Sequence, residues 1–417
     1  GDPGSLALNR SVISGNARSG VHTASLQAND CSIVDNGGNG VIAFGGAATV
    51  ANSTIARNRD GGISVFQGSV ALSNSTVSQN SGHNQGGILC DTAIISHSTI
   101  VRNEGQNTVG GIYGRLSVSL SNSIVAGNIG PGPGLADISA GSASATHSLI
   151  GDAASSGEIM HGVNGNIVGN NGSGTRPLSS ILNPNLADNG GPTFTHALVA
   201  GSVAINAADD GFAPLRDQRG YQRNGVSDMG AFEFGGTVPT SVVADRVVSR
   251  KNHGAAGMFD VLLPQTGPAG VECRRGSSAE SGTHRLVFIF PSQMTSIDGA
   301  SVTSGTGTVT AAALTENARE YVVDLAGVGN AQTITVRLTG LQDALGAQST
   351  SLSINMALLL GDTNGDRAVN AGDAQQTRNR SGQLAGATTF RSDVGADGTI
   401  NSGDLQIVRS NSGHATP

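Results

Sequence analysis

The sequence predicts a mainly β protein, in which a parallel β-helix is followed by a β-sandwich and a small α-helical unit. Three observations predict it. Short β-branched runs recur at a regular spacing through the first 150 residues, strand-length apolar runs without a helical period follow after residue 237, and two similar acidic loops occur near the end. The 417 residues contain 62 glycines, which agrees with several β domains separated by tight turns.

The repeat is clearest in six segments that each end in asparagine. These asparagines lie 20, 22, 22, 23 and 25 residues apart, and after a short gap a glycine followed by Val or Ile comes after each of the first five. A third short run completes the repeat, and three short strands per repeat are typical of one turn of a parallel β-helix. The segments are SVISGN at 11–16, CSIVDN at 31–36, STIARN at 53–58, STVSQN at 75–80, STIVRN at 98–103 and SIVAGN at 123–128.

Equivalent residues of stacked turns lie about 4.8 Å apart and therefore form ladders. We expect an inward ladder of Ile13, Ile33, Ile55, Val77, Ile100 and Val125. We also expect a turn ladder of Asn16, Asn36, Asn58, Asn80, Asn103 and Asn128, in which the asparagines adopt the left-handed backbone and their amides bond to one another. Asp35, Arg57, Gln79 and Arg102 precede these asparagines and should face outward. The pattern resembles the right-handed parallel β-helix of pectate-lyase-like solenoids.

Composition argues against several classes of protein. Charged residues make up 13% and aromatic residues 3% of the chain, and the net charge of −7 argues against a nucleic-acid partner. No apolar run approaches the roughly 18 residues of a membrane span. Cys31, Cys90 and Cys273 are too few and too widely spaced for a disulfide framework or a zinc site, and Cys31 and Cys90 are expected to be small buried residues. The chain begins without a basic and apolar leader, so a signal peptide is expected to be absent or removed.

The repeat region offers no convincing catalytic or cofactor-binding residue. Its acids do not recur at one ladder position, as a polysaccharide-cleaving site would require. Its histidines, His22, His83, His97 and His147, have no metal spacing and are interpreted as loop or surface residues. The turns lengthen at 81–85 and 104–109, which we interpret as loop variation rather than as a ligand-binding face. The acids are Asp30, Asp35, Asp60, Asp91, Glu104, Asp137, Asp152 and Glu158.

After the repeats the sequence pattern changes. The next segments are LADNGGPTFTHALVAGSVAINAADDG at 186–211 and RDQRGYQRNGVSDMGAFEF at 216–234. These segments resemble the choice-of-anchor Q module, which ends β-helical repeats in bacterial surface proteins. The resemblance implies an extracellular, surface-associated protein. A dense charged set lies in this module and is expected to form an ion-pair network that caps the open end of the solenoid. It comprises Asp217, Arg219, Arg223, Asp228 and Glu233.

Residues 237–360 are predicted to form an antiparallel β-sandwich, with strands at 258–263, 285–290, 321–325, 333–338 and 351–356. SRKNHGAAGMFDVLLP at 249–264 and GVECRRG at 270–276 resemble a spacer domain found before dockerin-like tails. Lys251 and His253 are interpreted as residues of a surface turn. The predicted domains are thus 1–175 for the β-helix, 176–236 for the closing module, 237–360 for the spacer and 361–417 for the tail.

The tail contains a duplicated acidic motif. GDTNGDRAVNAGDAQQTRNRSG at 361–382 recurs as SDVGADGTINSGDLQIVRSNSG at 392–413. Its oxygen-bearing residues fall at loop positions 1, 3, 5, 7, 9 and 12, the ligand positions of an EF-hand Ca²⁺ loop. The motif resembles a type I dockerin, an EF-hand-like pair. The predicted Ca²⁺ ligands are Asp362, Asn364, Asp366, Ala368, Asn370 and Asp373 in loop one, and Asp393, Asp397, Thr399, Asn401 and Asp404 in loop two.

Two departures distinguish these loops from the family pattern. Arg367 stands at position 6 of loop one, where glycine is expected, and Gly395 at position 3 of loop two supplies no ligand. We expect loop one to bind Ca²⁺ with its full set and loop two to bind more weakly or through a water. Whether loop two binds at all stays open. Val369 and Ile400, at position 8, are expected to pair and hold the loops together.

Dockerins dock onto cohesin domains through residues near positions 10 and 11, so a cohesin-like partner is one alternative for the tail. The residues at positions 10 and 11, Ala371-Gly372 and Ser402-Gly403, do not supply a strong hydroxyl pair, so packing of the tail within the chain remains an alternative. We interpret the chain as a non-catalytic secreted or cell-surface protein for adhesion, scaffolding or carbohydrate binding, with a polysaccharide or a cell-surface component as its partner. The alternative is a polysaccharide lyase or glycoside hydrolase whose site lies in turns that precede Gly1.

Overall fold

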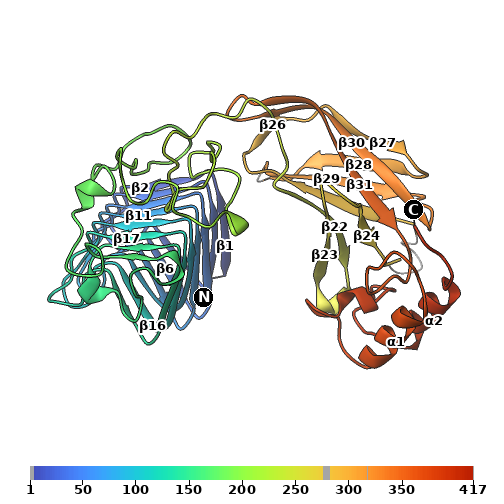
Figure 1. The fold of residues 1–417 in the computed structure, drawn as a ribbon, viewed down its shortest axis with the longest axis horizontal. Helices are drawn as coiled ribbons and strands as arrows, with labels where there is room; N and C mark the ends of the chain where they lie inside the picture. The colour runs from blue at the N-terminus through green and yellow to red at the C-terminus, as the bar shows by residue number, and fades with distance from the viewer. Residues whose placement is uncertain (1–3, 276–281, 317, 417) are drawn as a thin grey trace. The chain divides into compact units, whose positions relative to one another are not determined.

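The computed structural model describes residues 4–275, 282–316 and 318–416. The fold is mainly β, with 41% of the residues in strands and 9% in helices. It separates into two compact units, residues 1–238 and 239–417 (Figure 1). The first unit is a β-solenoid of about six turns, and the second contains the sandwich and both α-helices.

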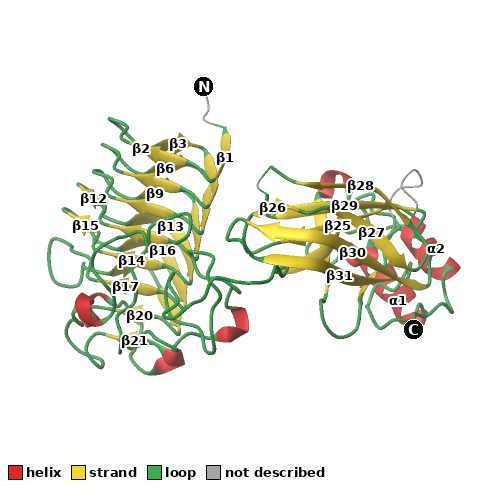
Figure 2. Ribbon diagram, turned by 90° about the horizontal axis from the view of Figure 1, so that it is seen from above, coloured by secondary structure: helices red, strands yellow, loops and turns green. Residues whose placement is uncertain are grey.

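Two parallel sheets run along the solenoid, and their strands stack turn upon turn (Figure 2). The larger sheet comprises β1 (Ser5–Asn9), β3 (Val21–Thr23), β4 (Ser25–Asn29), β6 (Val41–Phe44), β7 (Ala47–Ala51), β9 (Ile63–Phe66), β10 (Ser69–Ser73), β13 (Ile88–Ser96), β16 (Ile112–Ser121), β18 (Ile138–Ala140) and β19 (Ala143–Thr146). The second comprises β2 (Val12–Ser14), β5 (Ser32–Val34), β8 (Thr54–Ala56), β11 (Thr76–Ser78), β14 (Thr99–Val101), β17 (Ile124–Ala126), β20 (Leu149–Ile150) and β21 (Ile167–Val168).

The predicted aliphatic ladder is confirmed. In the second sheet Ile33 pairs with Ile55, Ile55 with Val77, and Val77 with Ile100. These side chains are fully buried in one continuous core, which Ile13 joins as a partly buried member. The lengthened turns are also regular, because β12 (Ser81–Gly82) and β15 (Glu104–Gly105) pair in parallel as a small third sheet. The repeat is thus maintained even where the turns grow.

The asparagine ladder is confirmed as well, with one correction to its backbone. Each amide Nδ2 donates to the Oδ1 of the next asparagine, from Asn16 through to Asn128, over 2.8–3.0 Å. The residue before the asparagine, rather than the asparagine itself, adopts the left-handed backbone, with φ of 58° at Asp35 and 56° at Arg57. This geometry turns the outward residue to solvent and leaves the asparagine inside, where Asn36, Asn58, Asn80 and Asn103 are buried.

The charged segment after the solenoid lies along its side, so the predicted end cap is wrong. Thr54, Thr76 and Thr99 of successive turns bond to Phe194, Gln218 and Ala231, respectively. Apolar residues on the outer face of the second sheet pack with this segment in a separate core. That core contains Val101, Ile124, Ala126, Leu149, Ile181, Leu182, Leu198, Ala204, Ala208, Met229 and Phe232.

The ion-pair network itself is present and buried. Arg219 pairs with Asp217 at 2.6 Å and Arg223 with Glu233 at 3.2 Å. The Arg223 guanidinium also donates to Asn74 of the solenoid over 3.1 Å. The ion pairs therefore join residues within the segment, and Arg223 also fastens the segment to the solenoid turn that contains Asn74.

The second unit contains a sandwich of two five-stranded sheets, as the sequence predicts. Their facing side chains form one core, which includes Leu286, Phe288, Val336 and Ile354. Unlike the predicted all-antiparallel arrangement, β24 pairs with β31 in parallel. The strands are β22 (Arg246–Asn252), β23 (Met258–Leu263), β24 (Gly270–Glu272), β25 (His284–Ile289), β26 (Met294–Ser296), β27 (Gly299–Ser304), β28 (Thr308–Leu314), β29 (Glu320–Ala326), β30 (Gln332–Asp343) and β31 (Gln348–Leu358).

Two helices, α1 (Ala371–Arg380) and α2 (Ser402–Ser410), follow the acidic loops. Each begins with a capping box, in which the position 9 asparagine and the position 12 aspartate satisfy backbone N–H groups at the helix start. The expected pairing of Val369 with Ile400 is wrong. Val369 instead bonds to the backbone of Gly413 and His414, while Ile400 bonds to Gly382 and Gln383, so the chain segments after each helix cover the loops.

Candidate metal centre

Loop one brings three carboxylates to one point. Ligand oxygens of Asp362, Asp366 and Asp373 all lie within 4.8 Å of one another, and this is the one such group of acidic, His or Cys side chains in the described part of the chain. Asp362 and Asp373 are buried, whereas Asp366 is exposed. Three carboxylates converging on one point are a donor set that suits a hard cation such as Ca²⁺.

The loop's backbone supports this arrangement. Asp362 accepts N–H bonds from Gly365, Asp366 and Arg367, which folds the loop around its first carboxylate. Asp373, in the first turn of α1, accepts from the N–H groups of Asn364 in the loop and of Asn370 at the helix cap, and these bonds hold the last carboxylate in place. Backbone N–H groups of the loop therefore hold these carboxylate oxygens in position.

The remaining predicted ligands of loop one gather around Asp366. The Asn364 amide donates to Asp366 over 2.9 Å, and the Asn370 amide lies 3.4 Å from the same carboxylate oxygen. The Ala368 carbonyl accepts from Asn370 over 3.3 Å. Hydrogen bonds thus link Asn364, Ala368 and Asn370 to one another and to Asp366, one of the three converging carboxylates.

The pKa values of two aspartates in loop one, Asp362 and Asp366, are shifted in opposite directions. Burial, together with the negative charge of Asp373, raises the pKa of Asp362. Hydrogen bonds from Asn364 and Ala368 lower the pKa of the exposed Asp366. A bound cation would offset both the burial of Asp362 and its repulsion by Asp373, since opposite charge favours the ionised form.

Arg367 adopts the left-handed backbone that position 6 requires, with φ of 73°. Its guanidinium donates to the Ala269 carbonyl of the sandwich. Arg391 joins the same two regions, because it donates to the carbonyls of Asp362 and Val271 over 2.8 and 3.0 Å. The sandwich therefore supports a turn that glycine ordinarily makes.

Residues 360–411 match the family model of the dockerin type I domain. The matched segment contains both acidic loops and both helices, and we refer to it as the dockerin domain. Dockerin domains bind Ca²⁺ in general and bind cohesin domains. No curated protein and no solved structure matches the chain.

Loop two of the dockerin domain has a different environment. Asp393 and Asp404 are buried and Asp397 is exposed, but their oxygens do not converge as those of loop one do. The Asn401 amide donates to the Thr399 carbonyl over 3.1 Å, and Gly395 adds no side-chain oxygen. Loop two thus reproduces the fold of loop one without its cluster of carboxylates.

The interpretation of Lys251 and His253 as surface residues is wrong. His253 is fully buried, and its Nδ1 lies 2.7 Å from Oδ2 of Asp393. Lys251 is buried and donates to the Thr283 carbonyl over 2.8 Å. No local sequence pattern indicates this contact, because 140 residues separate His253 from Asp393.

The solenoid acids are used in separate structural contacts. Asp35 pairs with Arg57 and Asp91 with Arg115, each at 2.7 Å. Asp137 is fully buried and accepts from the Asn128 amide over 2.9 Å, so it adds one more rung to the asparagine ladder. Burial raises its pKa to about 7. Cys31, Cys90 and Cys273 are buried free thiols, as expected for the first two.

His97 is a further correction, because it is buried rather than at the surface. Its ring contacts the Asn122 amide at 2.9 Å beneath the segment that covers the solenoid. Burial lowers its pKa to about 3. A neutral buried imidazole in this position is a packing residue.

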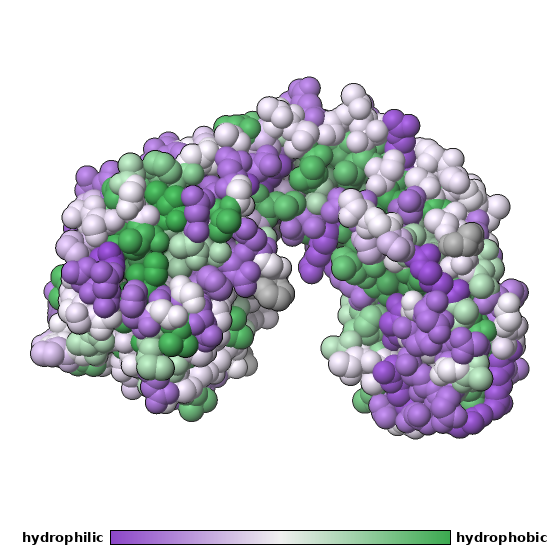
Figure 3. Space-filling model, viewed as in Figure 1, coloured by the Kyte–Doolittle hydropathy of each residue, from purple (hydrophilic) through white to green (hydrophobic). Residues whose placement is uncertain are grey.

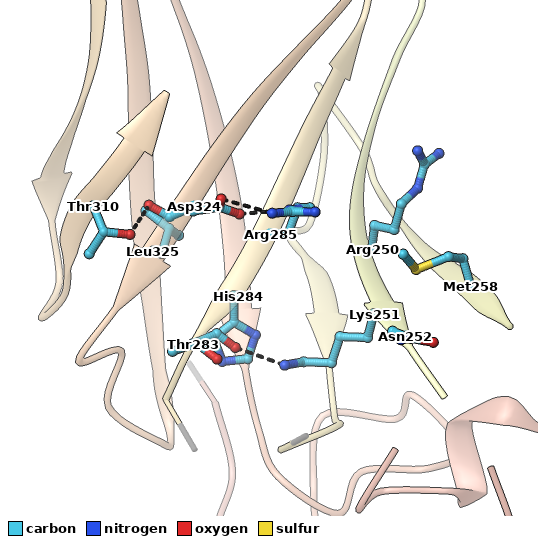
Figure 4. Close-up of a pocket in the computed structure, with 10 residues that line it drawn as sticks. All are labelled: Arg250, Lys251, Asn252, Met258, Thr283, His284, Arg285, Thr310, Asp324 and Leu325. Atoms are coloured by element: carbon cyan, nitrogen blue, oxygen red, sulfur yellow. Dashed lines mark hydrogen bonds and ion pairs between the residues drawn. The ribbon is translucent and has the colours of Figure 1, made fainter. Parts of the chain in front are cut away.

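A hollow of about 440 Å³ lies on the sandwich beside β22, β25 and β29 (Figure 4). Its charged side chains are engaged with their neighbours, since Arg285 pairs with Asp324 and Arg250 with Asp260. His284 lines it as a buried ring whose pKa burial lowers to about 3. Among the described residues, the cluster of converging carboxylates lies in loop one and not in this hollow.

Among the described residues, no helix is both long enough and apolar enough to cross a membrane.

Proposed function

We propose that the chain is a secreted component of a cellulosome-type assembly, in which a calcium-loaded dockerin domain binds a cohesin domain. The observation that carries the proposal is the convergence of Asp362, Asp366 and Asp373 within 4.8 Å at the start of a capped helix. Dockerin domains occur in extracellular cellulosome components, which supports secretion.

The residues of loop one fit a calcium ion. Asp362, Asp366 and Asp373 would supply charge, and the oxygens of Asn364, Ala368 and Asn370 would complete the shell of hard ligands. When bound, the cation would neutralise the mutual repulsion of the carboxylates and fix the loop against α1. The chain's own contribution is to hold these oxygens in position through backbone N–H bonds.

The helix starts are open to a partner. Ala371-Gly372 and Ser402-Gly403 are exposed, while Thr377 and Val408, farther along each helix, are buried. The surface of this region is mostly hydrophilic in the view of Figure 3. Small exposed residues at equivalent positions of two helices leave room for a cohesin domain to approach.

The solenoid is the part that such an assembly would display. Its role in this proposal is non-catalytic, in adhesion, scaffolding or binding of a polysaccharide or cell-surface component. The resemblance of residues 186–234 to the choice-of-anchor Q module supports a place at the cell surface. The dispersed pairing of the solenoid acids agrees with a structural role for those residues.

The test is calcium-dependent binding of the full chain to a purified type I cohesin domain. We expect binding with Ca²⁺, loss of binding on chelation, and a stronger loss in Asp366→Ala than in Asn401→Ala. Binding that persists in chelator, or no heat on titration with millimolar Ca²⁺, would contradict the proposal. Release of reducing ends or unsaturated products from polygalacturonate or alginate would instead support the enzyme interpretation.

A further inference from the structure

The two loops of the dockerin domain differ in the hydrogen-bond partners of the aspartate at position 1, Asp362 in loop one and Asp393 in loop two. In loop one the described contacts of the Asp362 carboxylate come from the loop's own backbone N–H groups. In loop two the Asp393 carboxylate also contacts an imidazole from the sandwich, His253. Both partners of this contact are fully buried.

The hydrogen-bond direction of His253 follows from its second neighbour. Its Nε2 lies 3.1 Å from Nη1 of Arg274, and a guanidinium can only donate. Nε2 is therefore the acceptor, and Nδ1 carries the hydrogen that is donated to Asp393. This fixes the imidazole as a bridge between the sandwich and the loop.

Arg274 is itself held firmly in the sandwich. Its guanidinium pairs with Glu272 at 2.7 Å, and it donates to the carbonyls of Phe259 and Ser249. Burial would raise the pKa of Glu272, but the charge of Arg274 outweighs burial and holds that pKa well below its usual value. A continuous buried chain of contacts thus runs from Glu272 through Arg274 and His253 to Asp393.

Other contacts surround the same joint. Gly398, at position 6, has φ of 97°, and a β-carbon there would lie 2.5 Å from the His253 carbonyl oxygen. The N–H of Arg275 donates to the Val394 carbonyl over 2.7 Å. Phe259 of the sandwich stacks on Phe390 with ring centroids 5.3 Å apart. Loop two and the sandwich are therefore in direct backbone contact.

We propose that loop two is not a calcium site but the docking site of the sandwich, with His253 bound to the carboxylate that a calcium loop would use for its cation. The donor set supports this, because Gly395 supplies no ligand and the three acids of loop two do not converge. The full chain accordingly binds one Ca²⁺, at loop one.

Calcium titration of the chelator-treated full chain tests the stoichiometry. Asp366 and Asp397 are both exposed and both stand at position 5, which makes them a matched pair. We expect one ion per chain, loss of that ion in Asp366→Ala, and unchanged binding in Asp397→Ala. Two ions in the unmodified chain, or loss of an ion in Asp397→Ala, would overturn the inference while leaving the calcium-loaded dockerin intact.

A double-mutant cycle in chelator tests the docking half independently of calcium. We expect His253→Ala and Asp393→Ala each to lower the thermal midpoint by several degrees, and the double variant to lower it no further than the larger single effect. If either variant fails to fold, the cycle is repeated with His253→Gln and Asp393→Asn, which keep a polar side chain at both positions. Additive shifts would refute the docking. Absence of all calcium binding would count against the proposed function, whereas this cycle would still decide the docking.

Discussion

The asparagine ladder of the solenoid and the aspartate cluster of loop one are built from side chains of nearly the same shape, but their hydrogen-bonding properties differ. An amide both donates and accepts, so each asparagine satisfies the next one and the ladder extends from Asn16 to Asn128. A carboxylate only accepts, so the three aspartates of loop one repel one another. The asparagine ladder is consequently satisfied by its own members, whereas the three converging carboxylates of loop one are a donor set that suits a cation.

Asp137 lies between these two cases. It continues the asparagine ladder by accepting from Asn128, and its other oxygen accepts from the backbone of Asp152 over 2.8 Å. One carboxylate can end a ladder of amides because it needs only donors. Burial raises its pKa to about 7.

The largest expected effect concerns the solenoid core. Ile55→Asp places an unpaired carboxylate at a fully buried rung and should lower the free energy of unfolding by roughly 4 kcal/mol. Ile94→Asp is the matched control, because Ile94 is 62% exposed on β13. Urea titration of both variants is the measurement, and equal midpoints would contradict the register of the ladder.

The second effect is a pH dependence that Asp137 imposes on the solenoid. Burial raises its pKa to about 7, above the unfolded value of about 3.9, so the folded state holds the proton more tightly. This contribution is fully present below about pH 4 and is lost as the pH rises to about 7, by a few kcal/mol. In Asp137→Asn, the urea midpoint of the solenoid should vary less with pH between pH 4 and 8. If the midpoint varies with pH as in the unmodified chain, Asp137 is not the group responsible.

The third effect separates the dockerin domain from the solenoid. Ca²⁺ at 100 times its Kd should stabilise the unit of residues 239–417 by about 2.7 kcal/mol and leave the solenoid unchanged. Hydrogen exchange with and without chelator resolves the two units in the intact chain. Asp366→Ala should abolish the calcium-dependent protection, and protection that appears equally in both units would argue against a local site.

A smaller effect is expected in the asparagine ladder. Asn80→Ala removes an amide that joins Asn58, Asn103 and the Ile55 carbonyl, and should cost about 1–3 kcal/mol because buried partners are left unsatisfied. Asn16→Ala, at the exposed start of the ladder, should cost much less. Comparison of their urea midpoints shows whether the interior of the ladder carries the stability.

The smallest effect is at the solenoid surface. Arg57 forms an ion pair with Asp35 at 2.7 Å, but both side chains remain well exposed. Arg57→Ala should therefore change the free energy of unfolding by no more than about 0.5 kcal/mol. A larger loss in low-salt urea titration would mean that the outward charges, and not only the ladders beneath them, hold neighbouring turns together.

Sequence repetition by itself determined the solenoid and the dockerin loops. A recurring isoleucine or asparagine meets its own copy one turn later, so the period predicts the partner, as Ile55 with Val77 and Asn58 with Asn80 show. The duplicated motif likewise predicted loop one, in which the structure brings Asp362, Asp366 and Asp373 together, because a calcium loop is built from one short stretch of chain. The serines at 53, 75, 98, 123 and 148 recur with the same period, and they form a third ladder in which each backbone N–H donates to the hydroxyl of the next serine.

Only the tertiary structure decided the contacts between segments that do not repeat. The outer face of the second sheet, not the solenoid end, receives the charged segment, because Ile124 and Leu149 need apolar cover there. His253 reaches Asp393 across 140 residues of sequence, and no local pattern encodes that distance. The ladders follow from the spacing of the repeat along the sequence. A single bond between distant residues, such as His253 and Asp393, depends on how two folded regions pack against each other.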